Sequence, residues 1–278
     1  MLLLACSEPD GDPAPSGVST SNGSTGASAS AGSGASGAGG ASTGGGATGG
    51  AGGTAPPLEV LFIGNSYTYV NDLPARLHEL AAEAETPPSI DVTSVTVGGA
   101  SFQMHWSGAD AQPAIADGHT HVVLQGQSVE PIAAPATFLE YGELLADAAT
   151  AAGSTPVLYQ TWARKAGDPI YADPISGGSP EAMQDGLTAA YATLAMETGA
   201  AVAPVGEAWR IAWTDHPEVE LYAADGSHPS AAGTYLAACV VYIVLTGKAA
   251  PEGGLPGNVE PADAAALREA ATQATAGR

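Results

Sequence analysis

Three side chains far apart in this sequence are of the types that together cleave esters. Ser66 follows the apolar run VLFI, and Asp225 and His228 stand three residues apart in the stretch DGSHPS. A serine hydroxyl becomes a good nucleophile when an imidazole takes its proton, and a carboxylate commonly orients that imidazole. Both stretches also have a structural interpretation, because strand-to-helix turns favour small polar residues and Ser230 could cap a helix.

Whether these side chains meet depends on the elements that carry them. Apolar runs of strand length alternate with segments of helical periodicity, and the runs are residues 58–63, 90–97, 121–125, 156–160 and 200–205. This alternation predicts parallel pairing through right-handed crossovers, and strands that are apolar throughout predict a sheet covered on both faces. We therefore expect an α/β fold with a doubly wound, mainly parallel five-stranded sheet.

The expected helices have recognisable start and stop signals. Asn71 or Asp72 is placed to cap the helix after the first strand, and Ser179 with Pro180 opens the helix after the fourth. Gly247 ends the last long helical pattern. These signals predict helices between the strands rather than long unstructured connections.

In sheets of this kind, ligands bind at the carboxyl ends of the strands. The loops that follow the expected strands contain Gly64-Asn65-Ser66, Gly98–Ser101, Gln125–Ser128 and Thr161-Trp162, and DGSHPS follows the fifth strand and a helix. Ser66, Asp225 and His228 thus share one edge of the expected sheet. This shared position favours the catalytic interpretation over the structural one.

Taken in order, these blocks resemble those of the SGNH or GDSL hydrolases, a family of serine esterases and lipases with a flavodoxin-like fold. The resemblance runs from Val60 to about Leu236, and its blocks are Gly64-Asn65-Ser66, the Gly98-Gly99 pair, LQGQS with Gln127, and Asp225 with His228 followed by Pro-Ser. Asn65 replaces the acid of the family's Gly-Asp-Ser block. Gln127 stands where the family's Gly-x-Asn block has asparagine, and its side chain is one methylene longer.

The resemblance implies a Ser-His-Asp mechanism. Ser66 would attack the acyl carbon, His228 would accept and return the proton, and Asp225 would orient His228. The implied donors to the oxyanion are the backbone N–H of Ser66, that of Gly98 or Gly99, and the side-chain amide of Gln127. The expected enzyme is a serine esterase.

Aromatic residues gather near the same edge of the expected sheet. Core packing is the default for such side chains, and the remainder could stack on sugar rings. We take Tyr67, Trp106 and Trp162 as candidates for substrate contact, which favours an O-acyl group, such as acetyl, on a carbohydrate. An acyltransferase, a lipase and an inactive glycan-binding lipoprotein on the same fold remain alternatives.

Other histidines are weaker candidates for catalysis. Asp215 and His216 are adjacent, so their side chains should point apart, and His119 and His121 flank the start of the third strand, away from the site. His105 follows the second block and could line the pocket or lie at the surface. No HExxH, paired-Cys, GxxxxGK[ST] or strand-following GxGxxG pattern is present, so we expect no metal and no cofactor.

The composition of the chain limits the classes of partner that it could bind. The formal net charge is −22, from 29 acidic and 7 basic side chains, so nucleic acid would be repelled. No run of eighteen apolar residues occurs, so a membrane contact would need an anchor. We expect a small-molecule or glycan ester as the partner, and no feature of the sequence indicates an oligomeric state.

The composition changes along the chain and divides it into three segments. Residues 1–6 end in Leu-Leu-Ala-Cys, which resembles part of a bacterial lipobox, so we expect lipid attachment at Cys6. The expected location is extracytoplasmic, as a lipoprotein in the periplasm or at the cell surface, with a secreted protein as the alternative. Residues 7–57 are almost entirely Gly, Ala, Ser, Thr and Pro and are expected to form a disordered linker. Residues 58–278 are expected to form the hydrolase-like domain, with Cys239 in its core.

Overall fold

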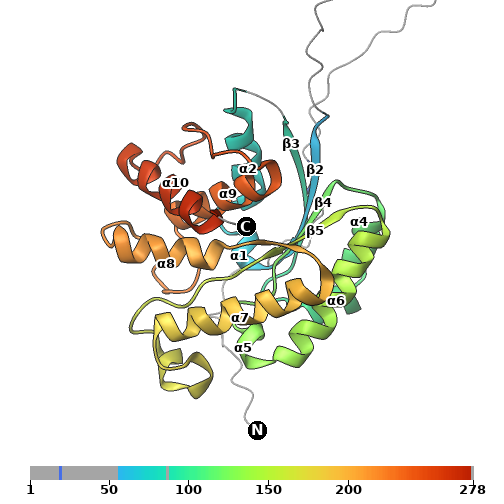
Figure 1. Ribbon diagram of the computed structural model, residues 1–278, viewed down its shortest axis with the longest axis horizontal. Coiled ribbons are helices and arrows are strands. Elements are labelled where there is room, and N and C mark those ends of the chain that lie inside the picture. Colours follow the sequence, from blue (N-terminus) through green and yellow to red (C-terminus); the bar gives the residue numbers. More distant parts are fainter. Residues whose placement is uncertain (1–18, 21–55, 86–87, 277–278) are drawn as a thin grey trace, which may run out of the picture.

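The computed structural model describes residues 19–20, 56–85 and 88–276 (Figure 1). Its strands are β2 (Leu58–Gly64), β3 (Ile90–Thr96), β4 (His121–Leu124), β5 (Thr155–Tyr159) and β6 (Ala201–Ala203). They pair in parallel in the order β3-β2-β4-β5-β6. This arrangement confirms the expected five-stranded parallel sheet.

Helices cover both faces of the sheet (Figure 1). One face carries α2 (Leu73–Ala82), α8 (Val205–Asp215), α9 (Ala231–Thr246) and α10 (Pro261–Thr275). The other carries α3 (Phe102–Ser107), α4 (Ala111–Ala116), α6 (Pro135–Ala151) and α7 (Pro180–Thr198). The short helices α1 (Ser66–Tyr69), α5 (Glu130–Ala133), η1 (Pro169–Ala172) and η2 (Pro174–Ser176) lie in the connections.

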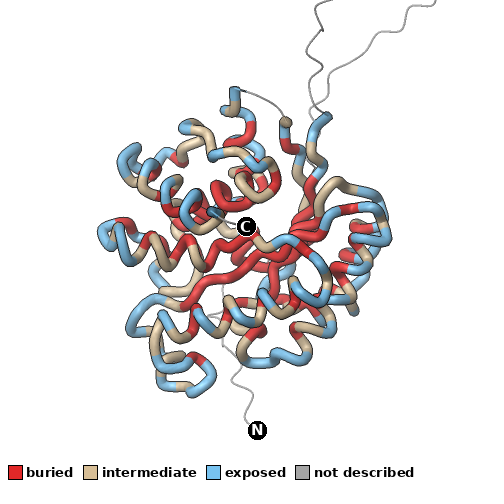
Figure 2. Tube along the Cα trace, viewed as in Figure 1, coloured by how far each residue is buried: buried red, intermediate tan, exposed pale blue. Residues whose placement is uncertain are grey.

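The core has two layers because side chains alternate along each strand. In β2, Val60 and Phe62 belong to the layer under α2, α8, α9 and α10, whereas Leu61 and Ile63 belong to the layer under α3, α4, α6 and α7. Buried residues make up most of the three central strands, β2, β4 and β5 (Figure 2). Each fully buried side chain of this size stabilises the fold by about 1.5–3 kcal/mol, so neither layer is dispensable.

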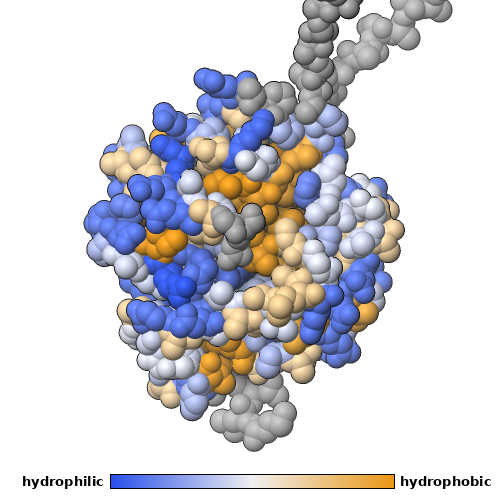
Figure 3. Space-filling view, in the orientation of Figure 1, coloured by the Kyte–Doolittle hydropathy of each residue, from blue (hydrophilic) through white to orange (hydrophobic). Residues whose placement is uncertain are grey.

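Helix α9 is apolar on almost every side. Eleven of its sixteen residues are buried. Two more, Ile243 and Val244, are partly buried and pack against the core layer that contains Val60 and Phe62. In the view of Figure 3, hydrophobic residues gather near the middle of the molecule, with hydrophilic residues around them. Helix α10, which the sequence patterns did not indicate, packs against α8 and α9 and so covers part of the apolar surface of α9.

The expected capping residues act as predicted. The Asp72 side chain accepts from the N–H of Ala75 at the start of α2, and Ser179 caps α7 in the same way through Ala182. Ser230 caps α9 through Gly233, and Gly247 ends that helix with a left-handed backbone. The capping role of Ser230 is therefore real, and it coexists with the placement of its neighbour His228.

Part of the expected domain organisation lies outside the described residues. This applies to the lipobox with Cys6 and to most of the linker, of which only residues 19–20 and 56–57 are described. Ser19–Thr20 form the two-residue strand β1, which pairs antiparallel with Thr93 and Ser94 at the edge of the sheet. Within the described parts of the chain, no helix combines the length and hydropathy needed to cross a bilayer.

Candidate active site

Ser66 stands in a tight turn between β2 and α1. Asn65 caps α1, because its side-chain oxygen accepts from the N–H of Tyr67 at 3.0 Å, and its Nδ2 donates to the carbonyl of Ala100 at 3.0 Å. A Cβ on Gly64 would lie 2.4 Å from Thr68 Oγ1 and 2.7 Å from Gln125 Oε1, so only glycine fits there. The residue that replaces the family's acid thus joins the serine turn to the second block.

Ser66, His228 and Asp225 form a continuous chain of hydrogen bonds. His228 Nε2 lies 2.9 Å from Ser66 Oγ, and His228 Nδ1 lies 2.5 Å from Asp225 Oδ2. The other carboxylate oxygen of Asp225 accepts from the N–H groups of Ser227 and His228, each at 2.9 Å. Partial burial opposes ionisation of Asp225, but these hydrogen bonds lower its pKa, so its carboxylate is charged at neutral pH.

Three backbone donors near the serine turn are free. Within the described residues, the N–H groups of Ser66, Gly98 and Gly99 have no hydrogen-bond partner. Asn65 brings these segments together through its bonds to Ala100 and, from its N–H, to Gln125 Oε1 at 2.9 Å. Free N–H groups next to a serine hydroxyl are what stabilisation of an oxyanion requires.

The two glutamines of the third block have different environments. Gln125 is fully buried, and its side chain is occupied by Asn65, Thr68 and the carbonyl of Gly126. Gln127 Oε1 accepts from the N–H of Val129 at 2.8 Å and of Glu130 at 3.0 Å. This leaves Gln127 Nε2 without a partner among the described residues, so of the two only Gln127 has a side-chain donor to offer a substrate.

Glu130 is a residue that the sequence patterns did not single out. Its side chain is buried, and its Oε2 accepts from the N–H groups of Phe102 and Gln127, each at 3.3 Å. It therefore ties the segment after Gly98-Gly99 to the segment of Gln127. Burial raises the pKa of Glu130, and the two backbone hydrogen bonds only partly oppose that rise.

His105 lies beneath the serine turn, neither in a pocket nor at the surface. Its side chain is buried, and its Nε2 donates to the carbonyl of Gly64 at 2.9 Å. Burial lowers its pKa, although the hydrogen bond to Gly64 opposes this, so a neutral ring supports the end of β2. His119 bonds Thr93 and His121 bonds Thr120, near the amino end of β4.

The predicted substrate contacts of Trp162 and Tyr67 need correction. Trp162 is completely buried and stacks between Tyr67 and Trp209, with ring centroids 4.3 and 4.0 Å away, so it belongs to the core. Tyr67 is 3% exposed, and its hydroxyl is bonded to Ser227 and Arg164. Trp106 is half-buried and packs against the second core layer. The spacing that placed Trp162 and Tyr67 at the strand ends could not show which way the rings point.

Tyr69 is an exposed aromatic residue beside Gly98. Its side chain is 39% exposed, and its hydroxyl lies 3.3 Å from the position that a Cβ on Gly98 would occupy. Tyr69 therefore flanks the second block from α1. It offers a substrate the kind of ring surface that was expected of Tyr67 and Trp162.

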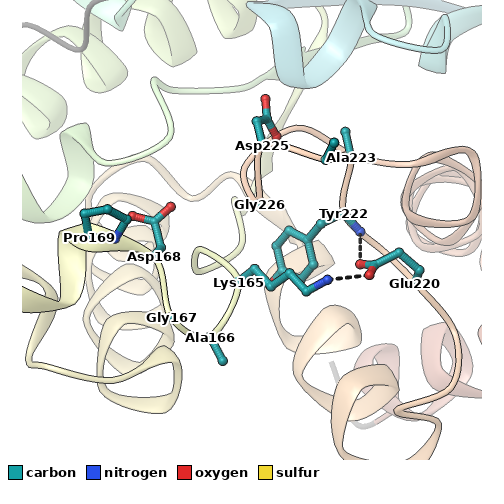
Figure 4. Close-up of a pocket in the computed structure, with 11 residues that line it drawn as sticks. Lys165, Ala166, Gly167, Asp168, Pro169, Glu220, Tyr222, Ala223, Asp225 and Gly226 are labelled. Atoms are coloured by element: carbon teal, nitrogen blue, oxygen red, sulfur yellow. Dashed lines mark hydrogen bonds and ion pairs between the residues drawn. The ribbon is translucent and has the colours of Figure 1, made fainter.

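A cavity of about 410 Å³ lies behind the loop that carries Asp225 (Figure 4). Its wall comes from residues 165–169, Glu220 and residues 222–226, and includes an ion pair between Lys165 and Glu220. A second cavity of about 310 Å³, which Trp213 helps to line, shares Lys165 and Glu220 with the first. In the described parts of the chain, no group of His, Cys, Asp and Glu side chains is arranged to hold a metal ion.

Fold and site together define a hydrolase of the serine type. A scan against protein-family models and a search of curated proteins found no match. Among solved structures, a protein from Slackia heliotrinireducens assigned to the SGNH hydrolases is 33% identical, with a TM-score of 0.59. The match covers 68% of this chain and 99% of that one. The chain therefore belongs to the SGNH hydrolase family and is a serine hydrolase that acts on ester bonds.

Two more distant structures share the fold. A DUF4886 family protein from Bacteroides uniformis is 20% identical, with a TM-score of 0.67, and the match covers 78% of this chain and 94% of that one. A catalytic mutant of Axe2, an acetylxylan esterase from Geobacillus stearothermophilus, is 14% identical, with a TM-score of 0.50. That match covers 68% of this chain and 92% of the mutant.

Proposed function

We propose that the enzyme removes O-acyl groups, such as acetyl, from a carbohydrate through the triad Ser66, His228 and Asp225. The observation that carries this proposal is the unbroken hydrogen-bond chain from Asp225 through His228 to Ser66, together with the free N–H groups of Ser66, Gly98 and Gly99 among the described residues. Each half of this arrangement answers one chemical demand of ester cleavage. The first supplies a base, and the second binds the negative charge that forms on the carbonyl oxygen.

In the first half of the reaction, Ser66 Oγ attacks the acyl carbon while His228 Nε2 takes the hydroxyl proton. The carbonyl oxygen becomes an oxyanion, bound by the N–H groups of Ser66 and of Gly98 or Gly99, and by Gln127 Nε2. The bond to the sugar oxygen then breaks, and His228 returns the proton to that oxygen. The products are the free alcohol and an acyl-Ser66 ester.

In the second half, water attacks the acyl-Ser66 ester while His228 takes one of its protons. The same donors bind the second oxyanion, and the bond to Ser66 Oγ breaks as His228 protonates it. The acid is released and Ser66 is regenerated. Asp225 keeps Nδ1 of His228 protonated throughout, so Nε2 is always the nitrogen that exchanges protons with Ser66 and substrate.

Two features support a carbohydrate as the alcohol. Tyr69 presents an exposed ring beside Gly98, and aromatic rings commonly stack on sugars. The cavity that Asp225 helps to line has mostly polar and small side chains in its wall, rather than the long apolar surface that a lipase needs for an acyl chain. The name of the acetylxylan esterase of like fold agrees with this class of substrate.

The deciding experiment is hydrolysis of 4-nitrophenyl acetate and of an acetylated xylo-oligosaccharide by the full chain beside Ser66→Ala. We expect the substitution to abolish turnover on both substrates without changing the circular dichroism spectrum. Ser107→Ala, which removes an exposed hydroxyl at the end of α3, serves as the matched control. Activity that persists in folded Ser66→Ala would refute the assignment.

The same assays separate the alternatives. Transfer of acetyl to an added sugar acceptor, in preference to water, would identify an acyltransferase. A preference for long acyl chains in a series of 4-nitrophenyl esters would identify a lipase. Binding of glycans with no turnover on any ester would identify an inactive lipoprotein.

We further propose that the chain is an extracytoplasmic lipoprotein anchored through Cys6. The support is the Leu-Leu-Ala-Cys stretch, followed by a Gly, Ala and Ser-rich tether that would hold the hydrolase away from a membrane. Mass spectrometry of the protein expressed with its upstream codons tests this. An unmodified Cys6 in the mature protein would overturn the anchor and leave the enzymatic proposal intact.

A further inference from the structure

Arg164 joins parts of the site that are distant in sequence. It follows β5 at the edge of the sheet where Ser66 lies, and its Nη1 donates to the Tyr67 hydroxyl at 2.8 Å. Its Nη2 donates to Ser128 Oγ at 3.0 Å, and Ser128 is buried in the third block. Within the described residues Arg164 makes no ion pair, so its guanidinium is used here to hold two neutral hydroxyl groups.

The hydroxyl of Tyr67 passes this contact on to the loop of residues 225–230, which we call the acid–base loop. Tyr67 Oη accepts from Arg164 and lies 2.9 Å from Ser227 Oγ. Burial raises the pKa of Tyr67, although Arg164 opposes this, so the hydroxyl keeps a proton to donate to Ser227. Ser227 immediately precedes His228, and its N–H is one of the two that bind the carboxylate of Asp225.

The ring of Tyr67 contacts the acid–base loop as well. It meets the His228 ring edge-on at a centroid distance of 5.8 Å, and its other neighbour, Trp162, donates from Nε1 to the Ser227 carbonyl at 3.0 Å. The guanidinium carbon of Arg164 lies 5.9 Å from the Tyr67 ring centroid. A change in the position of Tyr67 would therefore be felt by both Ser227 and His228.

We propose that Arg164 is a positioning residue, which fixes the Tyr67 hydroxyl on Ser227 and thereby keeps His228 within hydrogen-bonding distance of Ser66. This inference rests on the proposed function of the triad. Arginine suits this contact because its planar fork reaches the two hydroxyl groups from two separate nitrogens, whereas lysine would have to reach both from a single nitrogen. Misplacement of a catalytic group by about 1 Å can cost about 100-fold in rate, so the geometry is sensitive to such a clamp.

The experiment measures kcat and KM for 4-nitrophenyl acetate in the full chain carrying Arg164→Met, Tyr67→Phe or both. We expect each single variant to lower kcat about 10- to 100-fold with KM within about twofold. The reason is that Arg164 acts on the base His228 through Tyr67 and Ser227, and the proposal gives it no contact with substrate. The double variant should be no slower than the slower single variant, since both remove the same linkage. Arg164→Lys should recover only part of the loss.

The chain contains a matched control for these substitutions. Arg268 Nη1 donates to the Tyr235 hydroxyl at 3.0 Å, which is the same pairing at the contact of α10 with α9. Arg268→Met and Tyr235→Phe should leave kcat unchanged. Equal losses in both pairs would show a general effect on stability and would overturn the proposal.

Rescue gives a readout that a purely structural role would not move. Guanidinium chloride at about 20 mM should restore part of kcat in Arg164→Ala, and sodium chloride at the same concentration should not. If Arg164→Met misfolds, Tyr67→Phe, which loses one oxygen atom, still tests the linkage through its kcat. An unchanged kcat in folded Arg164→Met or in Tyr67→Phe, losses that multiply in the double variant, or a rise confined to KM would each refute it.

These outcomes are distinct from failure of the proposed function. If the parent protein shows no turnover that depends on Ser66, the triad mechanism itself fails. If the parent is active through Ser66 and Arg164→Met is equally active, only the positioning role fails.

Discussion

On one side of Ser66 the polar atoms of the acid–base loop are largely occupied within the protein, whereas on the other side the backbone donors are free. Asp225 accepts from two N–H groups and from His228, and Ser227 is bonded through its side chain and its carbonyl. Gly98 and Gly99 have no partner for their N–H groups among the described residues. The site thus contains both a closed network, in the acid–base loop, and an open one, at the free backbone donors.

The proposed mechanism accounts for this difference, because it needs the two sides at different times. A base must hold one orientation before substrate arrives, so its hydrogen bonds are made in advance. Oxyanion donors must be free until charge develops, and they are kept in place by bonds from other atoms of the same segments. Asn65, Gln125 and Glu130 provide those bonds, because they join the serine turn, the second block and the third block without using the free donors.

The largest loss of kcat is expected when the closed network is broken at the carboxylate of Asp225. Asp225→Asn should lower kcat about 10⁴-fold, because an amide in this position favours the wrong tautomer of His228. KM and the melting temperature should change little. Asp168→Asn is the control, since Asp168 lines the same cavity, and its capping bond to the N–H of Ile170 can be made equally by asparagine. Kinetics that match the parent in Asp225→Asn would remove Asp225 from the mechanism.

A smaller loss is expected on the open side, at Gln127. Glutamate there keeps the oxygen that accepts from Val129 and Glu130, but replaces the free Nε2 donor with an acceptor. Gln127→Glu should therefore fold normally and lose about 10²- to 10³-fold or more in kcat. The exposed Gln103→Glu adds the same charge elsewhere and should be close to the parent. A fully active Gln127→Glu would show that backbone N–H groups alone bind the oxyanion.

Much of this arrangement could be predicted from the sequence. Strand alternation gave the parallel sheet, and the loops after the strands placed Ser66, Gly98, Gln127 and Asp225 at one edge. The orientation of large side chains could not be predicted in this way. A tryptophan at a strand end can point outward to substrate or inward to the core, and Trp162 points inward between Tyr67 and Trp209.

Residues that act through contacts across the fold also escaped prediction. Arg164 and Glu130 belong to no sequence block, and each depends on partners that are distant along the chain: Phe102 is 28 residues from Glu130, and Ser128 and Tyr67 are 36 and 97 residues from Arg164. A weak signal was present for Arg164, as one of only seven basic residues in a chain of net charge −22, five residues after the end of β5. Nothing in the local sequence distinguished Glu130 from a solvated carboxylate.

The smallest effect is expected at Glu130, whose carboxylate accepts from the N–H groups of Phe102 and Gln127 on the open side of the site. Burial raises its pKa in the folded protein, so folding favours its protonated form and its contribution to stability is lost as pH rises through the raised pKa. Glu130→Gln carries no charge at any pH. The melting temperature of the variant relative to the parent should therefore increase from pH 4.5 to pH 7, measured by thermal unfolding. The exposed Glu140→Gln should show no such trend.

The same variant separates charge from geometry at the oxyanion donors. Glutamine keeps one oxygen that can accept from Phe102 and Gln127, so kcat on 4-nitrophenyl acetate should fall by no more than about tenfold. Glu130→Ala removes the acceptor as well and should cost more in kcat than Glu130→Gln. If the two variants were equally active, Glu130 would not position the Gln127 segment, and the open side would depend on Asn65 and Gln125 for its geometry.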